Sequence, residues 1–226
     1  MNTEKKHKRI LMVVTSHDRI DADRATGLWF EEFALPYVEF KAGGLAVAVA
    51  SPRGGAAPID PRSEPKSEAA SAWAEARQAL QQTKPLASVN AEDFDAIFLP
   101  GGHGTMFDLP GNDALHRLLQ AFVGADKVVA AVCHGPAGLV GAKRSNGTPL
   151  VAGKTITAFT DDEERAAGLD GAMPFLLETK LREMGARFVV RPNWSSHVEQ
   201  DGRLITGQNP QSSGDTARAI IEALKK

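Results

Sequence analysis

The sequence predicts an α/β fold, in which a single domain contains a mainly parallel β-sheet sandwiched by helices. Short, unbroken apolar runs alternate along the chain with longer segments whose apolar residues recur at helical spacing. Parallel strands that are buried on both faces have such unbroken runs. The 226 residues, of which 42% are hydrophobic, suffice for one large core, and no internal repeat or long linker divides them.

The first half of the chain is expected to supply three strands and two helices. Residues 10–14 form the first apolar run, and a helix is expected at 26–40, where Leu28, Phe33 and Tyr37 recur at helical spacing. The proline-rich stretch 51–67 has the composition of a loop. Further elements are expected at 45–50 (apolar strand), 68–82 (helix rich in Ala, Glu and Gln) and 96–99 (apolar strand).

The second half continues the alternation. Asn112 is expected to cap a helix at 112–123, and Asp201-Gly202 is expected to join two strands in a turn. A hairpin-like segment is expected around Asn146-Gly147. The other expected strands are 127–132, 155–158, 186–190, 198–199 and 204–206, and the other expected helices are 137–142, 173–184 and 213–224.

Charge and cysteine content exclude several classes of function. Lys+Arg number 26 and Asp+Glu 28, and the resulting net charge of −2 gives no electrostatic case for binding nucleic acid or an anionic membrane. No apolar stretch approaches the ~20 residues of a membrane span. The single cysteine excludes an intrachain disulfide and a multi-thiolate metal site. We therefore expect a cytoplasmic protein with a flexible start at 1–9 and one domain at 10–226.

Cys133 stands where the strand at 127–132 gives way to a helix. Two residues before and after it stand Ala131 and Gly135, and a nucleophile elbow requires small residues there because strand and helix approach closely. The amides at the helix start would lower the pKa of the thiol, and the His134 amide would donate to an oxyanion. The alternative is an inert, buried cysteine.

A glycine-rich turn and two acidic segments are candidates to complete this site. The glycines of 100–104, at the end of the neighbouring strand, would let a second amide reach an oxyanion, although a plain tight turn also explains them. One of Glu31 and Glu32 is expected to face the sheet, where burial would raise its pKa. The acidic run 161–164 would orient His134, although acids at a helix start explain most of it.

Together these motifs resemble the ThiJ/PfpI superfamily, which includes the parkinsonism-associated deglycase. The resemblance is strongest to its heat-shock chaperone and glutathione-independent glyoxalase III branch, and it extends over residues 10–224. It implies a flavodoxin-like fold, similar to that of class I glutamine amidotransferases, with an inserted loop at about 51–67. The segments that carry it are 23–27 with Glu32, 99–108, 129–136, 153–161 with Glu164, and 201–210.

The resemblance also implies roles for individual residues. Cys133 matches the nucleophile of the family and His134 the adjacent histidine of a Cys-His-acid triad. Glu164 matches the acid of that triad, although Asp161 and Glu163 stand close enough in the sequence to take its place.

Three further residues match positions around the nucleophile. Glu32 matches a buried glutamate that hydrogen-bonds the cysteine sulfur, with Glu31 as the neighbouring alternative. Gly102 matches the second oxyanion donor, and His103 matches a residue at the mouth of the site.

The activity implied by the resemblance is that of a glyoxalase of the D-lactate dehydratase type, a lyase for methylglyoxal detoxification under stress. It would convert a small 2-oxoaldehyde into a 2-hydroxy acid through a hemithioacetal on Cys133, with no metal and no cofactor. A homodimer and an additional chaperone activity toward unfolded proteins are also implied. The alternatives are a holdase chaperone or a cysteine oxidation sensor without aldehyde turnover, and a protein deglycase or thiol amidohydrolase.

Overall fold

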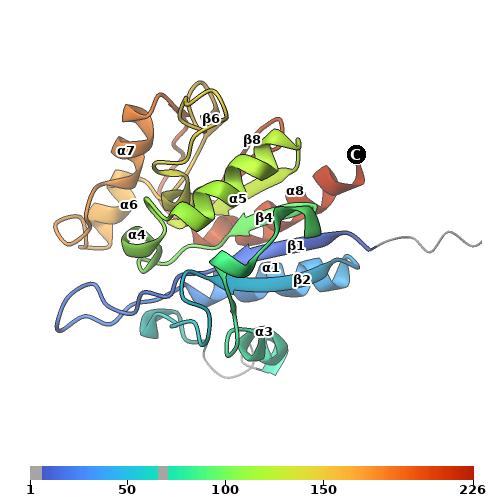
Figure 1. Cartoon of the computed structure of the whole chain (residues 1–226). Helices are drawn as coiled ribbons and strands as arrows, with labels where there is room; N and C mark the ends of the chain where they lie inside the picture. Colours follow the sequence, from blue (N-terminus) through green and yellow to red (C-terminus); the bar gives the residue numbers. More distant parts are fainter. Residues whose placement is uncertain (1–6, 66–70) are drawn as a thin grey trace, which may run out of the picture.

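The computed structural model describes residues 7–65 and 71–226. A seven-stranded sheet with the order β3-β2-β1-β4-β5-β9-β8 runs through its centre (Figure 1). Every neighbouring pair is parallel except β8 and β9, which form an antiparallel hairpin around the predicted turn. The strands are β1 (Arg9–Val13), β2 (Ala46–Ser51), β3 (Lys84–Pro85), β4 (Ala96–Leu99), β5 (Val128–Val132), β8 (Val198–Asp201) and β9 (Leu204–Gly207). The predicted mainly parallel sheet is confirmed.

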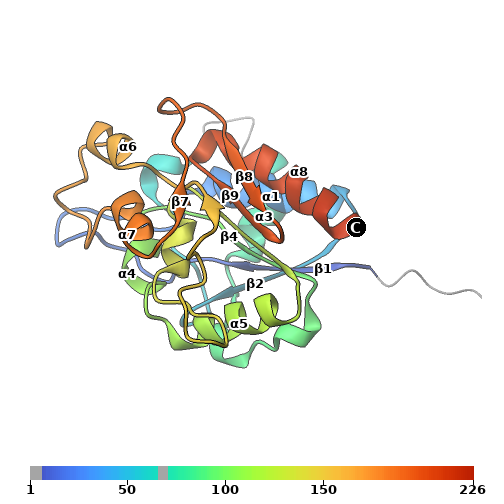
Figure 2. The same ribbon diagram turned by 90° about the horizontal axis from the view of Figure 1, so that it is seen from above.

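Helices cover both faces of this sheet (Figures 1 and 2). On one face α8 (Ser213–Lys225) packs on β5, β9 and α1 (Phe30–Ala42), and α3 (Ala74–Ala79) packs beside α1; on the other lies α5 (Asp113–Gly124). The side chains of β1 alternate between the two cores: Leu11 and Val13 join the core on the α5 side, and Ile10 and Met12 the core on the α1 side. Burial on both faces is why the strand is apolar at each of these positions.

The helix expected at 26–40 begins only at Phe30. The Leu28 amide donates to Pro58 O at 2.9 Å, and the Leu28 carbonyl accepts from the Asp60 amide at 2.9 Å. Residue 28 therefore pairs with the 51–67 loop instead of beginning a helix. Periodicity could not reveal this because Leu28 is fully buried in the extended form as well.

Other elements differ from the expectations in length or partner. The helix expected at 137–142 is a 3₁₀ helix, η4 (Gly135–Leu139), and the strand expected at 155–158 is β6 (Thr155–Ile156). Instead of joining the main sheet, β6 pairs with β7 (Arg187–Phe188) in a separate two-stranded sheet. The remaining elements are α4 (Thr105–Asp108), α6 (Asp161–Ala166), α7 (Leu177–Glu183), η1 (Pro61–Ser63), η2 (Leu86–Ser88), η3 (Ala91–Asp93) and η5 (Pro210–Ser212).

Three expectations fall partly outside the described residues, and one of them is the loop at 51–67, whose residues 66 and 67 lie outside. Of the flexible start expected at 1–9, residues 1–6 lie outside them and Arg9 already belongs to β1. Of the helix expected at 68–82, residues 68–70 lie outside them, and the helix found is α3. Within the described ranges, no helix is both long and apolar enough to cross a lipid bilayer.

The carboxyl ends of β4 and β5 lie side by side because the two strands pair in parallel, with Leu99 opposite Ala131. The chain leaves β4 through the glycine turn after Leu99 and leaves β5 through Cys133. Ligands bind beyond this edge of an open α/β sheet. The fold therefore brings the cysteine and the glycine turn to the place where a site is expected.

Candidate active site

Cys133 occupies a tight turn between β5 and η4. Its φ of 58° lies in the left-handed region, which costs a residue with a side chain about 1–2 kcal/mol. Gly135 approaches the neighbouring strand so closely that a Cβ there would lie 2.0 Å from the carbonyl oxygen of Leu99. The turn thus has the geometry of a nucleophile elbow, with a strained cysteine at its tip and a required glycine beyond it.

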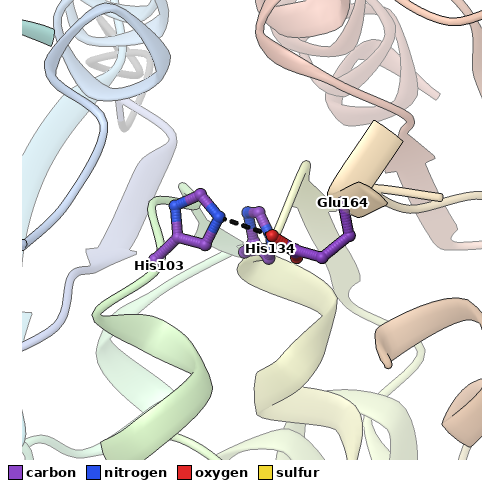
Figure 3. Close-up of side chains that lie close together, drawn as sticks. All are labelled: His103, His134 and Glu164. Carbon is purple, nitrogen blue, oxygen red and sulfur yellow. Dashed lines mark hydrogen bonds and ion pairs between the residues drawn. The ribbon is translucent and has the colours of Figure 1, made fainter. Parts of the chain in front are cut away.

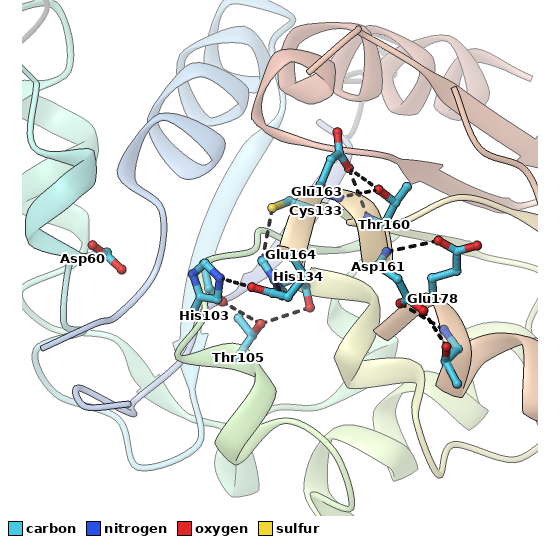
Figure 4. Close-up of polar contacts among 12 residues, drawn as sticks. Asp60, His103, Thr105, Cys133, His134, Thr160, Asp161, Glu163, Glu164 and Glu178 are labelled. Atoms are coloured by element: carbon cyan, nitrogen blue, oxygen red, sulfur yellow. Dashed lines mark hydrogen bonds and ion pairs between the residues drawn. The ribbon is translucent and has the colours of Figure 1, made fainter. Parts of the chain in front are cut away.

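The thiol, an imidazole and a carboxylate form a chain of contacts (Figure 4). Figure 3 shows the imidazole and the carboxylate together with His103. Cys133 Sγ lies 3.3 Å from His134 Nδ1, and His134 Nε2 lies 2.7 Å from Glu164 Oε2. All three residues are buried. The carboxylate accepts a hydrogen bond from Nε2–H of His134, so Nε2 holds the proton and the unprotonated Nδ1 faces the thiol.

His103 contacts the second oxygen of the same carboxylate. Its Nε2 lies 2.8 Å from Glu164 Oε1, while its Nδ1 lies 3.1 Å from an Arg62 amino group. Arginine only donates, so Nδ1 of His103 accepts and its Nε2 proton points to Glu164. Burial, reinforced by the neighbouring His134, lowers the pKa of His103 to about 4, so this imidazole is neutral at physiological pH.

The triad acid is the one in contact with both imidazoles. Burial alone would raise the pKa of Glu164, but His134 and His103 outweigh it and hold this pKa well below its usual range. Asp161 faces away and bonds Thr179. Glu163 accepts from other groups, Thr160 among them (Figure 4). Of the three acids that the sequence left open, Glu164 is therefore the one beside His134.

Glu32 is fully buried and interacts with the Cys133 thiol, whereas its neighbour Glu31 is exposed. The Gly101 amide donates to Glu32 Oε2 at 2.8 Å, and Oε1 has no partner within hydrogen-bonding distance among the described residues. Burial raises the pKa of Glu32 to about 8, against the opposing effect of its interaction with the Cys133 thiol. At neutral pH this carboxyl keeps its proton, and the protonated group interacts with the thiol of Cys133.

The expectation that the turn lowers the pKa of the thiol is wrong. Burial raises the pKa of Cys133 well above its ordinary value, and Glu32 raises it further. The five-residue 3₁₀ helix after the turn does not offset the loss of solvation. Cys133 is therefore a neutral thiol at rest, and the proton acceptor within hydrogen-bonding distance of its sulfur is His134 Nδ1.

The two amides expected to bind an oxyanion belong to segments that Thr105 ties together. Its hydroxyl lies 2.8 Å from the Gly102 carbonyl and 3.0 Å from the His134 carbonyl. Gly102 has a φ of 102°, and a Cβ there would lie 2.3 Å from the Trp29 amide. In the described part of the chain, neither the Gly102 nor the His134 amide donates a backbone hydrogen bond.

A cavity of about 100 Å³ opens onto the thiol. Three large aromatic side chains contribute to its walls, and the Arg62 side chain, which also lines it, is 44% exposed. The residues that line it are Trp29, Arg62, Gly102, His103, Cys133, His134, Phe159, Ala167, Trp194 and Pro210. Sequence reasoning assigned no role to Trp29, Arg62, Phe159 or Trp194, and the only signal for Phe159 was its place in the 153–161 segment.

The same side chains are the candidate metal ligands of the described residues. One ligating atom from each of His103, His134 and Glu164 lies within 4.8 Å of the others, and two imidazoles with a carboxylate are a donor set that suits zinc. In the structure, however, both Nε2 atoms are engaged with the carboxylate. The arrangement is that of a hydrogen-bonded triad with a second histidine.

Several known proteins are similar to this chain over most of its length. The chain is 35% identical to glutathione-independent glyoxalase hsp3101 of Schizosaccharomyces pombe, over 87% of each chain. The crystal structure of glyoxalase III from Candida albicans superposes with a TM-score of 0.88 at 30% identity, over 96% of this chain and 97% of that one. The X-ray structure of Rapid Encystment Protein 24 kDa of Francisella tularensis superposes with a TM-score of 0.91 at 36% identity, over 96% of this chain and 99% of that one.

A family-wide comparison covers almost the whole domain. The sequence profile of the DJ-1/PfpI family matches residues 25–223. This range begins before α1 and ends within α8, so it includes the glycine turn, the cysteine elbow and the acid of α6. The fold, the site and the profile lead to one conclusion: the chain belongs to the DJ-1/PfpI family.

Proposed function

We propose that the protein is a glutathione-independent glyoxalase that converts methylglyoxal or a similar 2-oxoaldehyde into a 2-hydroxy acid. The observation that carries the proposal is the 3.3 Å contact between Cys133 Sγ and His134 Nδ1 inside a cavity of about 100 Å³. The names of the relatives support it. A cavity this small suits a three-carbon aldehyde better than an amide within a protein chain.

The first step joins enzyme and substrate. The sulfur of Cys133 bonds to the aldehyde carbon, C1, while the thiol proton passes to His134 Nδ1. The electron pair of the C=O π bond moves onto the oxygen, which becomes an alkoxide. The amides of Gly102 and His134 stabilise this negative charge. Glu164 stabilises the imidazolium that forms, in the manner of the acid in other catalytic triads. Return of this proton to the alkoxide gives a neutral hemithioacetal.

The second step moves a hydrogen between the two carbons. Neutral His134 removes the proton from C1, an enediol forms, and a proton is delivered to C2. The electron pair of the former C1–H bond ends in the new C2–H bond. C1 is thereby oxidised to a thioester and C2 reduced to an alcohol, so the reaction needs no external redox partner.

The third step releases the product. Water adds to the thioester, the C–S bond breaks, and the 2-hydroxy acid leaves with the regenerated Cys133. A protonated Glu32 beside the sulfur stabilises the departing thiolate. Glu32 therefore acts on the leaving group, and His134 carries out the proton transfers.

The test is turnover of methylglyoxal by purified protein without any added thiol, with lactate quantified by chiral chromatography. Wild type is expected to form D-lactate, and Cys133→Ala only the background amount. Equal, background rates for both proteins would contradict the proposal. The homodimer, the chaperone activity and the cytoplasmic location that the resemblance implies stay predictions.

A further inference from the structure

We propose that Trp194 is the wall that limits substrate size in the active-site cavity, and that the buried carboxylate of Glu163 fixes this wall. The choice of test aldehydes rests on the proposed function, whereas the geometry of the wall does not. The inference restricts the substrate class to 2-oxoaldehydes whose second carbon has a small substituent. Neither residue takes part in the chemical steps described above.

Trp194 belongs to an aromatic layer that begins at the reactive histidine. The Phe159 ring lies 4.3 Å from the His134 ring, and the Trp194 ring lies 5.6 Å from Phe159, measured between centroids. Trp194 lines the cavity and is 43% exposed, so it separates the reactive groups from solvent. A substrate bonded to Cys133 and larger than the cavity would collide with this indole.

The backbone of Trp194 is held in an unfavourable conformation. Its φ of 65° lies in the left-handed region, where a bulky side chain is rare and destabilising. Such a conformation persists only where surrounding contacts determine it, and it is typical of functional sites. Two contacts do so here: the Trp194 amide donates to Glu163 Oε1 at 2.9 Å, and Asn209 Nδ2 donates to the next carbonyl, Ser195 O, at 2.8 Å.

Glu163 is the centre of these contacts. It is fully buried, and besides the Trp194 amide it accepts from the side-chain amides of Gln208, at 3.1 Å, and Asn209, at 2.8 Å. Its other oxygen accepts from the amide and the hydroxyl of Thr160. In the described part of the chain no lysine or arginine pairs with it. Glu163 is thus a buried carboxylate whose hydrogen-bond donors are all uncharged amide and hydroxyl groups. Because the buried carboxylate needs these hydrogen bonds, it determines where each donor lies.

One short helix connects the wall to the triad. Glu163 and Glu164 are consecutive in α6, and their side chains leave in different directions (Figure 4). Glu164 faces the two imidazoles, whereas Glu163 faces the segment of Trp194. The catalytic acid and the support of the cavity wall are thus fixed by the same element, which keeps the distance between wall and reactive groups constant.

The first experiment measures access to the thiol without relying on aldehyde chemistry. Cys133 is the only cysteine of the chain, so alkylation reports this site alone. Iodoacetamide and its N-phenyl derivative share a reacting group and differ in bulk. In Trp194→Ala we expect the rate ratio of large to small reagent to rise about tenfold or more over wild type. Trp73→Ala removes an indole outside the cavity and should leave the ratio unchanged.

The second experiment tests the support. Glu163→Gln places an amide NH₂ group, which cannot accept a hydrogen bond, among the groups that donate to Glu163. This weakens the contacts that hold the Trp194 segment, so we expect the alkylation-rate ratio of large to small reagent to rise about threefold or more although Trp194 is still present. The altered charge near Cys133 affects both reagents equally and cancels in the ratio. Asn209→Ser keeps a side-chain oxygen to cap η5 but loses the hydrogen bonds to Glu163 and Ser195. If Glu163→Gln does not fold, this variant replaces it in the same measurement.

The third experiment compares kcat/KM for phenylglyoxal and methylglyoxal in wild type and Trp194→Ala, with a shift toward phenylglyoxal expected. An unchanged alkylation ratio in Trp194→Ala would show that Trp194 does not limit the size of molecules that reach Cys133. A shift in Trp194→Ala without one in Glu163→Gln or Asn209→Ser overturns the role of Glu163. If alkylation shifts as expected but wild type turns over neither aldehyde, the wall stands and the proposed function fails.

Discussion

Nε2 of His134 lies 2.7 Å from Oε2 of Glu164, and this contact determines which nitrogen of the imidazole faces the thiol. The Nε2–H group of His134 donates a hydrogen bond to the carboxylate, so Nδ1 is left as the acceptor beside Cys133. Because the thiol is neutral at rest, the proposed mechanism depends on this acceptor more than it would with a preformed thiolate. The first two predictions follow from that dependence.

Replacing Glu164 with Gln should lower kcat by about 10²–10⁴-fold and change KM little. The amide neither stabilises an imidazolium nor selects the productive tautomer, and losses of this order accompany such changes in other triads. The measurement is steady-state formation of 2-hydroxy acid from methylglyoxal. Asp161→Asn is the matched control, since Asp161 lies in the same helix and contacts Thr179 instead of the histidines. Equal losses in both variants would contradict the assignment.

His103→Ala should lower kcat by about ten- to a hundredfold, because a hydrogen bond to a charged group contributes about 1.5–3 kcal/mol. Without its contact at Oε1, the pKa of Glu164 rises toward its ordinary value. The acid limb of the pH–rate profile should therefore move to higher pH. His197→Ala, whose ring bonds Glu199 instead, should move neither quantity. A lower rate without a displaced acid limb would assign His103 a different role.

Glu32 should make the stability of the protein depend on pH between about 4.5 and 8. Its pKa is about 8 in the folded protein against an ordinary value of 4.5, so the folded state binds the extra proton in this window. Stability then falls as pH rises through the window, because the unfolded state releases that proton first. Urea unfolding at pH 5 and pH 8 should show a larger loss for wild type than for Glu32→Gln. Parallel losses would contradict the raised pKa.

Local signals in the sequence sufficed to identify Cys133 as the candidate nucleophile, and the family resemblance favoured this reading over an inert buried cysteine. An apolar strand that ends at Cys133, with small residues at fixed offsets, indicates a strand-to-helix turn whatever the rest of the chain does. The glycine turn at 100–104 was recognisable for the same reason, whereas the choice of Gly102 within it came from the family resemblance. The cysteine turn and the glycine turn can each be read from residues adjacent in sequence. The structure brings the two turns together because β4 and β5 pair in parallel.

Features that depend on tertiary contacts were not recognisable in this way. The choice among the acids of 161–164 depends on where α6 begins, and Thr160 fixes that start as its N-cap. Arg62 lies in the three-residue 3₁₀ helix η1 and Trp194 lies outside helices and strands, and no periodicity places either of them at the cavity. The pKa of Cys133 was expected to be low because the turn is visible in the sequence, whereas burial is not.

The elbow itself predicts a stability effect at Gly135. A Cβ at this position would lie 2.0 Å from Leu99 O, so Gly135→Ala must push η4 away from β4. We expect a loss of about 2–3 kcal/mol in the free energy of unfolding, typical of overpacking at a buried site. Gly124→Ala is the matched control, because a Cβ there meets nothing within 4 Å and the residue lies in α5. It should be neutral or slightly stabilising in urea unfolding. Equal midpoints for the two variants would mean that the turn tolerates a side chain, and the close approach of η4 to β4 would not be a constraint on this fold.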